Sequence, residues 1–149
     1  MASTSILEQI RRNAVALISL VVAVTSLGYN TWRNEASEGN RNQRWASFEL
    51  LLELGELHQV LDHLYYDRDI ENRGNPRKGW AIVDLIQGIS IVIDDPIPAR
   101  AQALHREWED NWSCVARRAD CDHAEALDDI EKAMEALRSD LVTHLQMLD

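Results

Sequence analysis

Positive charge is the first thing that this sequence has little of. It carries 15 Lys+Arg against 25 Asp+Glu, which gives a formal net charge of −10. The deficit belongs to one part of the chain. From Ala46 onward the sequence has ten basic and 22 acidic residues, whereas up to Trp45 it has five basic and three acidic residues. An acidic body repels phosphate backbones, so we expect no nucleic-acid partner.

The sequence also lacks the short motifs that carry catalytic chemistry. It has no nucleophile elbow, no glycine-rich phosphate loop and no HExxH. Glu53, Glu56 and His58 lie close together, but carboxylate-bridged metal bundles need Glu-x-x-His on paired helices, a pattern that this sequence does not contain. We interpret the three residues as a solvated acidic face, and we predict a non-enzyme without metal or cofactor.

Cysteine is scarce as well, with Cys114 and Cys121 alone, in SCVARRADCDH between two helical patterns. A turn there could bring the two together, and a disulfide in an oxidising periplasm would then stabilise the loop by about 2–3 kcal/mol. Free thiols, as expected in the cytoplasm, are the alternative, and the sequence does not choose between them. Cys121 and His123 could contribute to a zinc site, but the four-ligand spacing is missing.

Charge is absent altogether from residues 14–29, AVALISLVVAVTSLGY. A helix that continues from this run to Trp32 would be about 28 Å long, close to the roughly 30 Å of a bilayer's hydrocarbon core. A buried core helix and a cleaved signal peptide are the alternatives, but the best cleavage site, at 23–25, is weak. We predict an uncleaved transmembrane anchor over residues 14–32 that contacts membrane lipid.

The borders of this segment are typical of a membrane interface. Arg11 and Arg12 precede it, and Tyr29 and Trp32 close it with an aromatic belt. Translocation of a short tail with two arginines is disfavoured, whereas a long domain is exported largely regardless of its charge. Arg accounts for 13 of the 15 basic residues, which fits a GC-rich bacterial genome. We therefore predict a bacterial inner-membrane protein with a cytoplasmic N-terminus and a periplasmic C-terminal domain.

One face of the predicted anchor is small and polar. Its residues recur at spacings of three and four: Ala16, Ser19, Ala23, Ser26 and Asn30. Small side chains let helix backbones approach closely in lipid, and hydroxyl or amide groups can bond across the contact. We predict that this stripe packs against other transmembrane helices, either in a homo-oligomer or in subunits of a membrane complex.

Beyond the anchor, apolar residues repeat with helical spacing. Leu50, Leu54, Leu57, Leu61 and Leu64 predict a helix from about 43 to 70. The composition of NRGNPRKG, 72–79, predicts a loop. The Ile and Val content of WAIVDLIQGISIVI, 80–93, suits a strand, but no second strand exists to pair with it, so we predict a helix.

Two further helices follow. Asp95 is the expected N-cap of the next helix, with Pro96 in the first turn. The apolar stripe of that helix runs through Ala101, Leu104, Trp108, Trp112 and Val115. Asp122 is the expected cap of the last helix. The apolar residues of that helix repeat in a near-heptad pattern: Leu127, Ile130, Met134, Leu137, Leu141, Leu145 and Leu148.

Together these patterns predict an all-α fold, in which one N-terminal transmembrane helix is followed by a small antiparallel bundle of about four helices. The first bundle helix can be continuous with the anchor. The predicted organisation is a short N-terminal tail over 1–13, the anchor over 14–32, a stalk over 33–44 and the bundle domain over 45–149.

Two places in the bundle are candidate partner contacts. Trp108 and Trp112 would gather large rings at one end, although the interpretation of both as core residues is preferred. Arg73, Arg77 and Lys78 stand out on an acidic body and could meet anionic headgroups or an acidic partner, although a solvated loop explains them too.

We therefore predict a non-catalytic accessory or scaffold protein that assembles with itself or with a larger bacterial membrane complex. The alternative is a membrane-tethered sensor that binds a ligand between its helices. In layout alone the chain resembles the four-helix input domains of bacterial membrane receptors. Those domains have a second membrane helix and an output domain, and the sequence contains neither, which favours the accessory interpretation.

Overall fold

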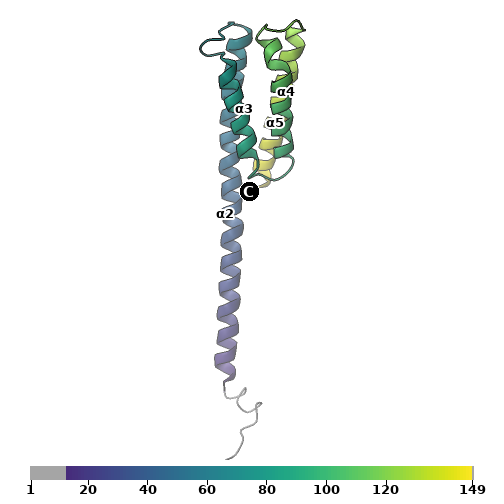
Figure 1. Ribbon diagram of the computed structural model, residues 1–149. Coiled ribbons are helices and arrows are strands. Elements are labelled where there is room, and N and C mark those ends of the chain that lie inside the picture. Colours follow the sequence, from purple (N-terminus) through teal and green to yellow (C-terminus); the bar gives the residue numbers. More distant parts are fainter. Residues whose placement is uncertain (1–12, 149) are drawn as a thin grey trace, which may run out of the picture. The chain divides into compact units, whose positions relative to one another are not determined.

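The computed structural model describes residues 13–148, in which helices are joined by loops. No strand occurs among these residues, which contain four α-helices: α2 (Ala14–Tyr65), α3 (Pro76–Ser90), α4 (Ile97–Val115) and α5 (His123–Met147) (Figure 1). The predicted all-α class is confirmed, and α3 forms where a strand was the alternative, although it ends at Ser90 rather than at residue 93. Arg11 and Arg12, the predicted interface residues, lie outside the described residues.

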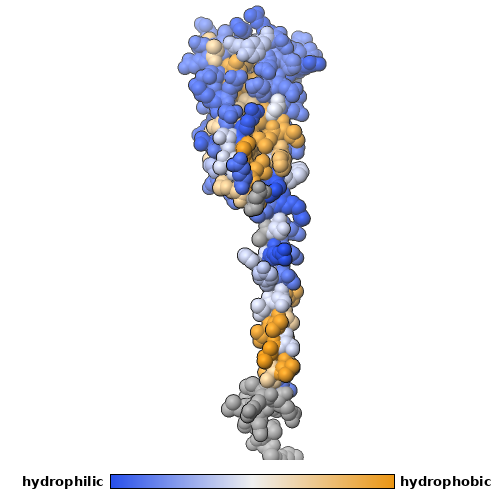
Figure 2. Space-filling model, turned by 180° about the vertical axis from the view of Figure 1, so that it is seen from behind, coloured by the Kyte–Doolittle hydropathy of each residue, from blue (hydrophilic) through white to orange (hydrophobic). Residues whose placement is uncertain are grey.

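The chain divides into two compact units, residues 1–40 and 41–149. The described part of the first unit belongs to α2, which contains an 18-residue stretch that is apolar and long enough to cross a membrane. None of that stretch is buried by the rest of the chain. Figure 2 shows this part of α2 with extensive orange, apolar surface.

The second unit is a helical bundle around one core. The leucine stripe predicted from the sequence supplies its first wall, because Leu50, Leu54, Leu57 and Leu61 are fully buried. The other helices contribute apolar residues of matching spacing: Ile82, Val83 and Ile86 from α3, Ile97, Ala101, Leu104 and Trp108 from α4, and Ala126, Leu127, Ile130, Met134, Leu137 and Leu141 from α5. Removing these side chains from water is the main source of the bundle's stability.

Local capping explains where two of these helices begin. The Asn75 side chain accepts a hydrogen bond from the Arg77 N–H at 3.0 Å, and Pro76 occupies the first turn, where its missing N–H leaves nothing unpaired. The Asp122 carboxylate accepts from the N–H groups of Ala124 and Glu125 at 2.9 and 3.1 Å. The predicted cap of the last helix is therefore confirmed.

Other predicted boundaries were wrong. Asp95 does not cap α4, whose N-cap is Pro96 without a side-chain bond, because the Ile97 N–H bonds the backbone carbonyl of Asp94 instead. The first bundle helix ends at Tyr65 rather than near 70, and Arg68 adopts a φ of 55°, a left-handed conformation that a helix cannot continue through. The predicted loop 72–79 is helical from Pro76 onward, because Asn75 and Pro76 start α3 early.

Polar contacts join distant parts of the second unit. The Gln43 amide donates to Asp94 at 3.1 Å, and the Lys78 ammonium lies 3.3 Å from the Glu56 carboxylate. Arg100 at the start of α4 pairs with Asp140 in α5 at 2.7 Å. These contacts fix which stretches of neighbouring helices lie opposite one another.

Gly79 allows α3 to approach the core closely. A Cβ atom at Gly79 would overlap the ring of the fully buried Trp108, whereas a Cβ at Gly88, on the exposed side of the same helix, would meet nothing within 4 Å. We predict that Gly79→Ala lowers the free energy of unfolding by about 1–3 kcal/mol through overpacking.

Gly88→Ala is the matched control, and we expect it to raise stability by up to about 1 kcal/mol through helix propensity. Urea unfolding of the full-length protein in detergent, followed by circular dichroism, measures both effects. Equal effects of the two variants would contradict the close approach of α3 to Trp108.

Candidate functional site

The predicted anchor stripe lies on a bare helix. All five of its residues are exposed in the described structure: Ala16, Ser19, Ala23, Ser26 and Asn30. The bulkier residues beside them are equally uncovered, with Leu20 and Val24 about 60% exposed. Beside the stripe, the hydroxyls of Thr25 and Thr31 donate to backbone carbonyls one turn earlier, at 2.8 and 3.0 Å, so these two hydroxyls have hydrogen-bond partners within the helix. The rings of Tyr29 and Trp32 lie 6.1 Å apart.

The bundle carries an exposed apolar surface of its own. Six of the ten exposed large apolar side chains in residues 41–148 belong to α2, α3 or the turn after α3, and we call them the α2/α3 face: Trp45, Phe48, Leu52, Leu85, Ile91 and Val92. The Gln43–Asp94 and Glu56–Lys78 contacts lie at the two ends of this surface, so residues 45–52 lie opposite residues 85–92. Figure 2 shows apolar residues gathered on a bundle that is otherwise largely hydrophilic.

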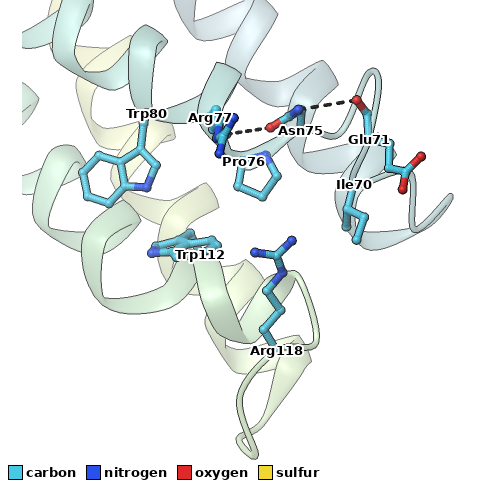
Figure 3. A pocket seen from close by; sticks show the side chains of 8 residues that line it. All are labelled: Ile70, Glu71, Asn75, Pro76, Arg77, Trp80, Trp112 and Arg118. Carbon is cyan, nitrogen blue, oxygen red and sulfur yellow. Dashed lines mark hydrogen bonds between the residues drawn. The ribbon is translucent and has the colours of Figure 1, made fainter.

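A pocket of about 490 Å³ opens between the start of α3, the end of α4 and the loops that precede and follow them (Figure 3). Its lining combines two indoles, two guanidinium groups and smaller side chains: Ile70, Glu71, Asn75, Pro76, Arg77, Trp80, Trp112 and Arg118. This volume falls within the range of small-molecule sites.

The two indoles are held by the core beneath them. Trp80 and Trp112 are partly buried and pack against the core cluster. The Trp80 ring also meets the ring of His105 edge-on at 5.5 Å, and the Nε2 atom of His105 lies 3.0 Å from the Asp84 carboxylate. The rings therefore form fixed walls rather than loose surface groups.

Arg118 reaches the pocket because α4 ends in a tight reversal. Arg117 has a φ of 55°, its N–H donates to the Cys114 carbonyl at 2.9 Å, and the Arg118 N–H donates to Ser113 at 2.8 Å. This pair of bonds is the Schellman pattern, here with an arginine in place of the usual glycine. The reversal directs Arg118 over Trp112, with its Cζ atom 5.8 Å from the ring centroid.

The loop on the other side of the pocket is organised by Asp69. Its carboxylate accepts from the backbone N–H groups of Asn72 and Arg73, at 3.0 and 3.1 Å, and from the Asn72 side chain. The backbone bonds from Arg73 and then Asn72 lower the pKa of Asp69 below its ordinary 3.8. A Cβ at Gly74 would overlap the backbone of Leu64, so the loop closes tightly onto the end of α2.

The structure brings only some of the predicted contact residues to this pocket. Arg77 and Trp112 line it, whereas Trp108 is fully buried in the core, so the interpretation of Trp108 as a surface contact is wrong. Lys78 pairs with Glu56, and Arg73 lines a separate pocket of about 210 Å³ with Lys78.

Trp80 and Arg118 were not anticipated as site residues. Nothing local marks them, since Trp80 looks like the start of a buried helix and Arg118 like part of a polar turn. They meet only because α3 and α4 pack together.

The acidic face on α2 is more crowded than its spacing suggests. Partial burial, and after it the charges of Glu56 and Glu49, raise the pKa of Glu53, while Lys78 opposes this effect. The carboxylates thus repel one another along one side of the helix.

Cys114 and Cys121 form a disulfide, with their Cα atoms 6.0 Å apart. His123 lies beside them, and its Nδ1 atom is 2.9 Å from the Cys114 carbonyl oxygen. These three side chains place their ligand atoms within 4.8 Å of one another. Zinc is bound by thiolates, however, and the disulfide leaves none here.

Comparison with known proteins adds no relative. No family model, no curated protein and no solved structure matches this chain.

Asp69 makes the stability of the pocket loop depend on pH. Because its folded-state pKa is lowered, its contribution is present above the ordinary value of 3.8 and is lost as the pH falls through the folded-state pKa. Asp69→Ala should therefore lower the urea midpoint at pH 7, and the difference from the wild type should vanish towards about pH 2.

Asp120→Ala is the control for the Asp69 experiment, because Asp120 is exposed and accepts no hydrogen bond from a backbone N–H group within the described residues. Its urea midpoint should follow that of the wild type at every pH. If the urea midpoints of Asp69→Ala and the wild type differ by the same amount at every pH down to 2, Asp69 does not act through its charge.

Proposed function

We propose that this protein is a non-catalytic, single-pass membrane protein whose helical domain assembles with further copies of itself. The observation that carries the proposal is the apolar segment of α2, none of which is covered by its own chain. Exposing such a surface to water is costly, whereas lipid and other transmembrane helices can cover it.

The α2/α3 face supports a second copy as the partner. Trp45, Leu52 and Ile91 are each more than 60% exposed, and a group of six such side chains exceeds the scattered apolar residues expected of a monomer. Burying them would supply much of the roughly 800 Å² that each partner contributes to a standard interface. The glycines Gly55 and Gly88 lie on the same helices and leave room for a close approach.

The distribution of charge also favours this face. Residues 41–92, which include α3 and the α2/α3 face, carry six basic and eight acidic residues, whereas residues 93–149 carry six and fourteen. Two copies that meet through the nearly neutral half keep their acidic halves apart. Anchoring both copies in one membrane would raise their effective concentration further.

The proposed setting is a bacterial inner membrane, with the N-terminus in the cytoplasm and the bundle in the periplasm. The Cys114–Cys121 disulfide supports an oxidising compartment. The proposed arrangement of the bundle is antiparallel. In support, Gln43 meets Asp94 just beyond the end of α3, and Arg100 at the start of α4 meets Asp140 near the end of α5.

Membrane insertion is tested by alkaline carbonate extraction of cell membranes. We expect the wild type to stay in the pellet and the double variant Leu20→Arg/Val24→Arg to be released, because each charge at a helix centre costs about 2.5–3.5 kcal/mol. Ser37→Arg, outside the apolar run, should stay in the pellet. Release of the wild-type protein would contradict the anchor.

Self-assembly is tested by cysteine cross-linking in the same membranes. Leu52→Cys and Leu85→Cys should give disulfide-linked homodimers under mild oxidation, because both lie on the α2/α3 face, whereas Glu135→Cys on the exposed side of α5 should not. Phe48→Asp/Leu52→Asp should halve the particle mass in mild detergent without changing the circular dichroism spectrum. A monomeric wild-type particle, or one that contains other subunits in fixed ratio, would overturn self-assembly.

A further inference from the structure

The pocket between α3 and α4 concentrates positive charge in an acidic protein. Several basic side chains of the bundle meet carboxylates, as Lys78 does with Glu56 and Arg100 with Asp140. In the described structure, neither Arg77 nor Arg118 has a carboxylate partner within 4 Å, although both line this pocket. The chain as a whole carries a net charge of −10, so two guanidinium groups that line one cavity give this cavity a local excess of positive charge.

The geometry leaves both guanidinium groups available to a ligand. Arg118 is held over Trp112 by a cation–π contact, which positions the group but does not neutralise it. Figure 3 shows its guanidinium group directed towards Pro76, while the Glu71 carboxylate turns away at the far edge of the pocket. The backbone of Arg77 is fixed by the Asn75 cap at 3.0 Å.

The walls of the pocket select for a flat ligand. Trp80 and Trp112 come from different helices, both pack on the core, and both line the cavity (Figure 3). Aromatic rings stack on indole faces with favourable dispersion and quadrupole interactions. The volume of about 490 Å³ accommodates a ligand of one or two fused rings.

We propose that this pocket binds a flat aromatic carboxylate, whose rings lie against Trp80 and Trp112 and whose carboxylate lies between Arg77 and Arg118. Arginine binds planar carboxylates through paired hydrogen bonds, which gives both strength and orientation. The proposal does not depend on membrane insertion or self-assembly, because every residue that carries it lies within residues 41–149.

The experiment compares two probes of the same shape by isothermal titration calorimetry with the full-length protein in detergent. Indole-3-acetate carries the carboxylate, and indole-3-acetamide is its neutral counterpart. We expect indole-3-acetate to bind at least about tenfold more tightly, which is the scale of one charge-assisted hydrogen bond.

Two variants assign the selectivity to the pocket. Arg118→Gln and Arg77→Gln should each remove most of the preference for indole-3-acetate, while Trp80→Leu should weaken both probes. Arg138→Gln on α5 is the matched control and should leave both affinities unchanged, since Arg138 pairs with Glu135 away from the pocket. Circular dichroism of each variant shows whether it is folded.

Several results would overturn the proposal. These are equal affinities for the two probes, no saturable heat at millimolar concentration, or an unchanged preference in a folded Arg118→Gln variant. Selective binding of indole-3-acetate would support the pocket even if the protein failed the carbonate or cross-linking test. Failure of the proposed function can therefore be distinguished from failure of this inference.

Discussion

The uncovered apolar surface at the start of α2 is the constraint on which the rest of this molecule depends. Leu20 and Val24 are about 60% exposed, and no part of the 18-residue apolar stretch is buried by the chain itself. A soluble core helix of similar composition would be covered by its own fold. This chain instead buries the leucine stripe that comes later in α2, from Leu50 to Leu64. The first unit therefore carries an apolar surface that its own chain does not cover, and its length and composition suit a membrane span.

The bundle buries the apolar side chains of its core within its own fold. Its leucine stripe is fully buried by α3, α4 and α5, and Gly79 allows Trp108, the largest core side chain, to lie directly against α3. The N-terminal ends of α3 and α5 are fixed by side-chain caps, Asn75 for α3 and Asp122 for α5. The pocket walls depend on the core packing, because Trp80 and Trp112 rest on the core beneath them.

Much of the fold could be predicted because its determinants are local. Leucines at helical spacing and an aspartate before the last helix act within a few residues, so the four helices and the Asp122 cap follow from the sequence. The Asp95 cap failed because the backbone carbonyl of Asp94 took the first amide of α4. The pocket could not be predicted, since Trp80 and Arg118 are far apart in sequence and meet only through helix packing. Trp108 and Trp112 lie one turn apart, yet only Trp112 reaches the pocket.

The pocket places two arginines in a bundle whose second half is strongly acidic. Residues 93–149 hold fourteen acidic residues against six basic ones, and Arg100 and Arg138 pair there with carboxylates. Arg118 does not, because the reversal at Arg117 turns it onto the face of Trp112. A cation–π contact leaves the charge uncompensated, so the guanidinium group can still form hydrogen bonds with the carboxylate ligand that we propose. The acidic surroundings would then act as a filter, since only an anion with a large flat body gains enough from the two indoles to overcome the repulsion.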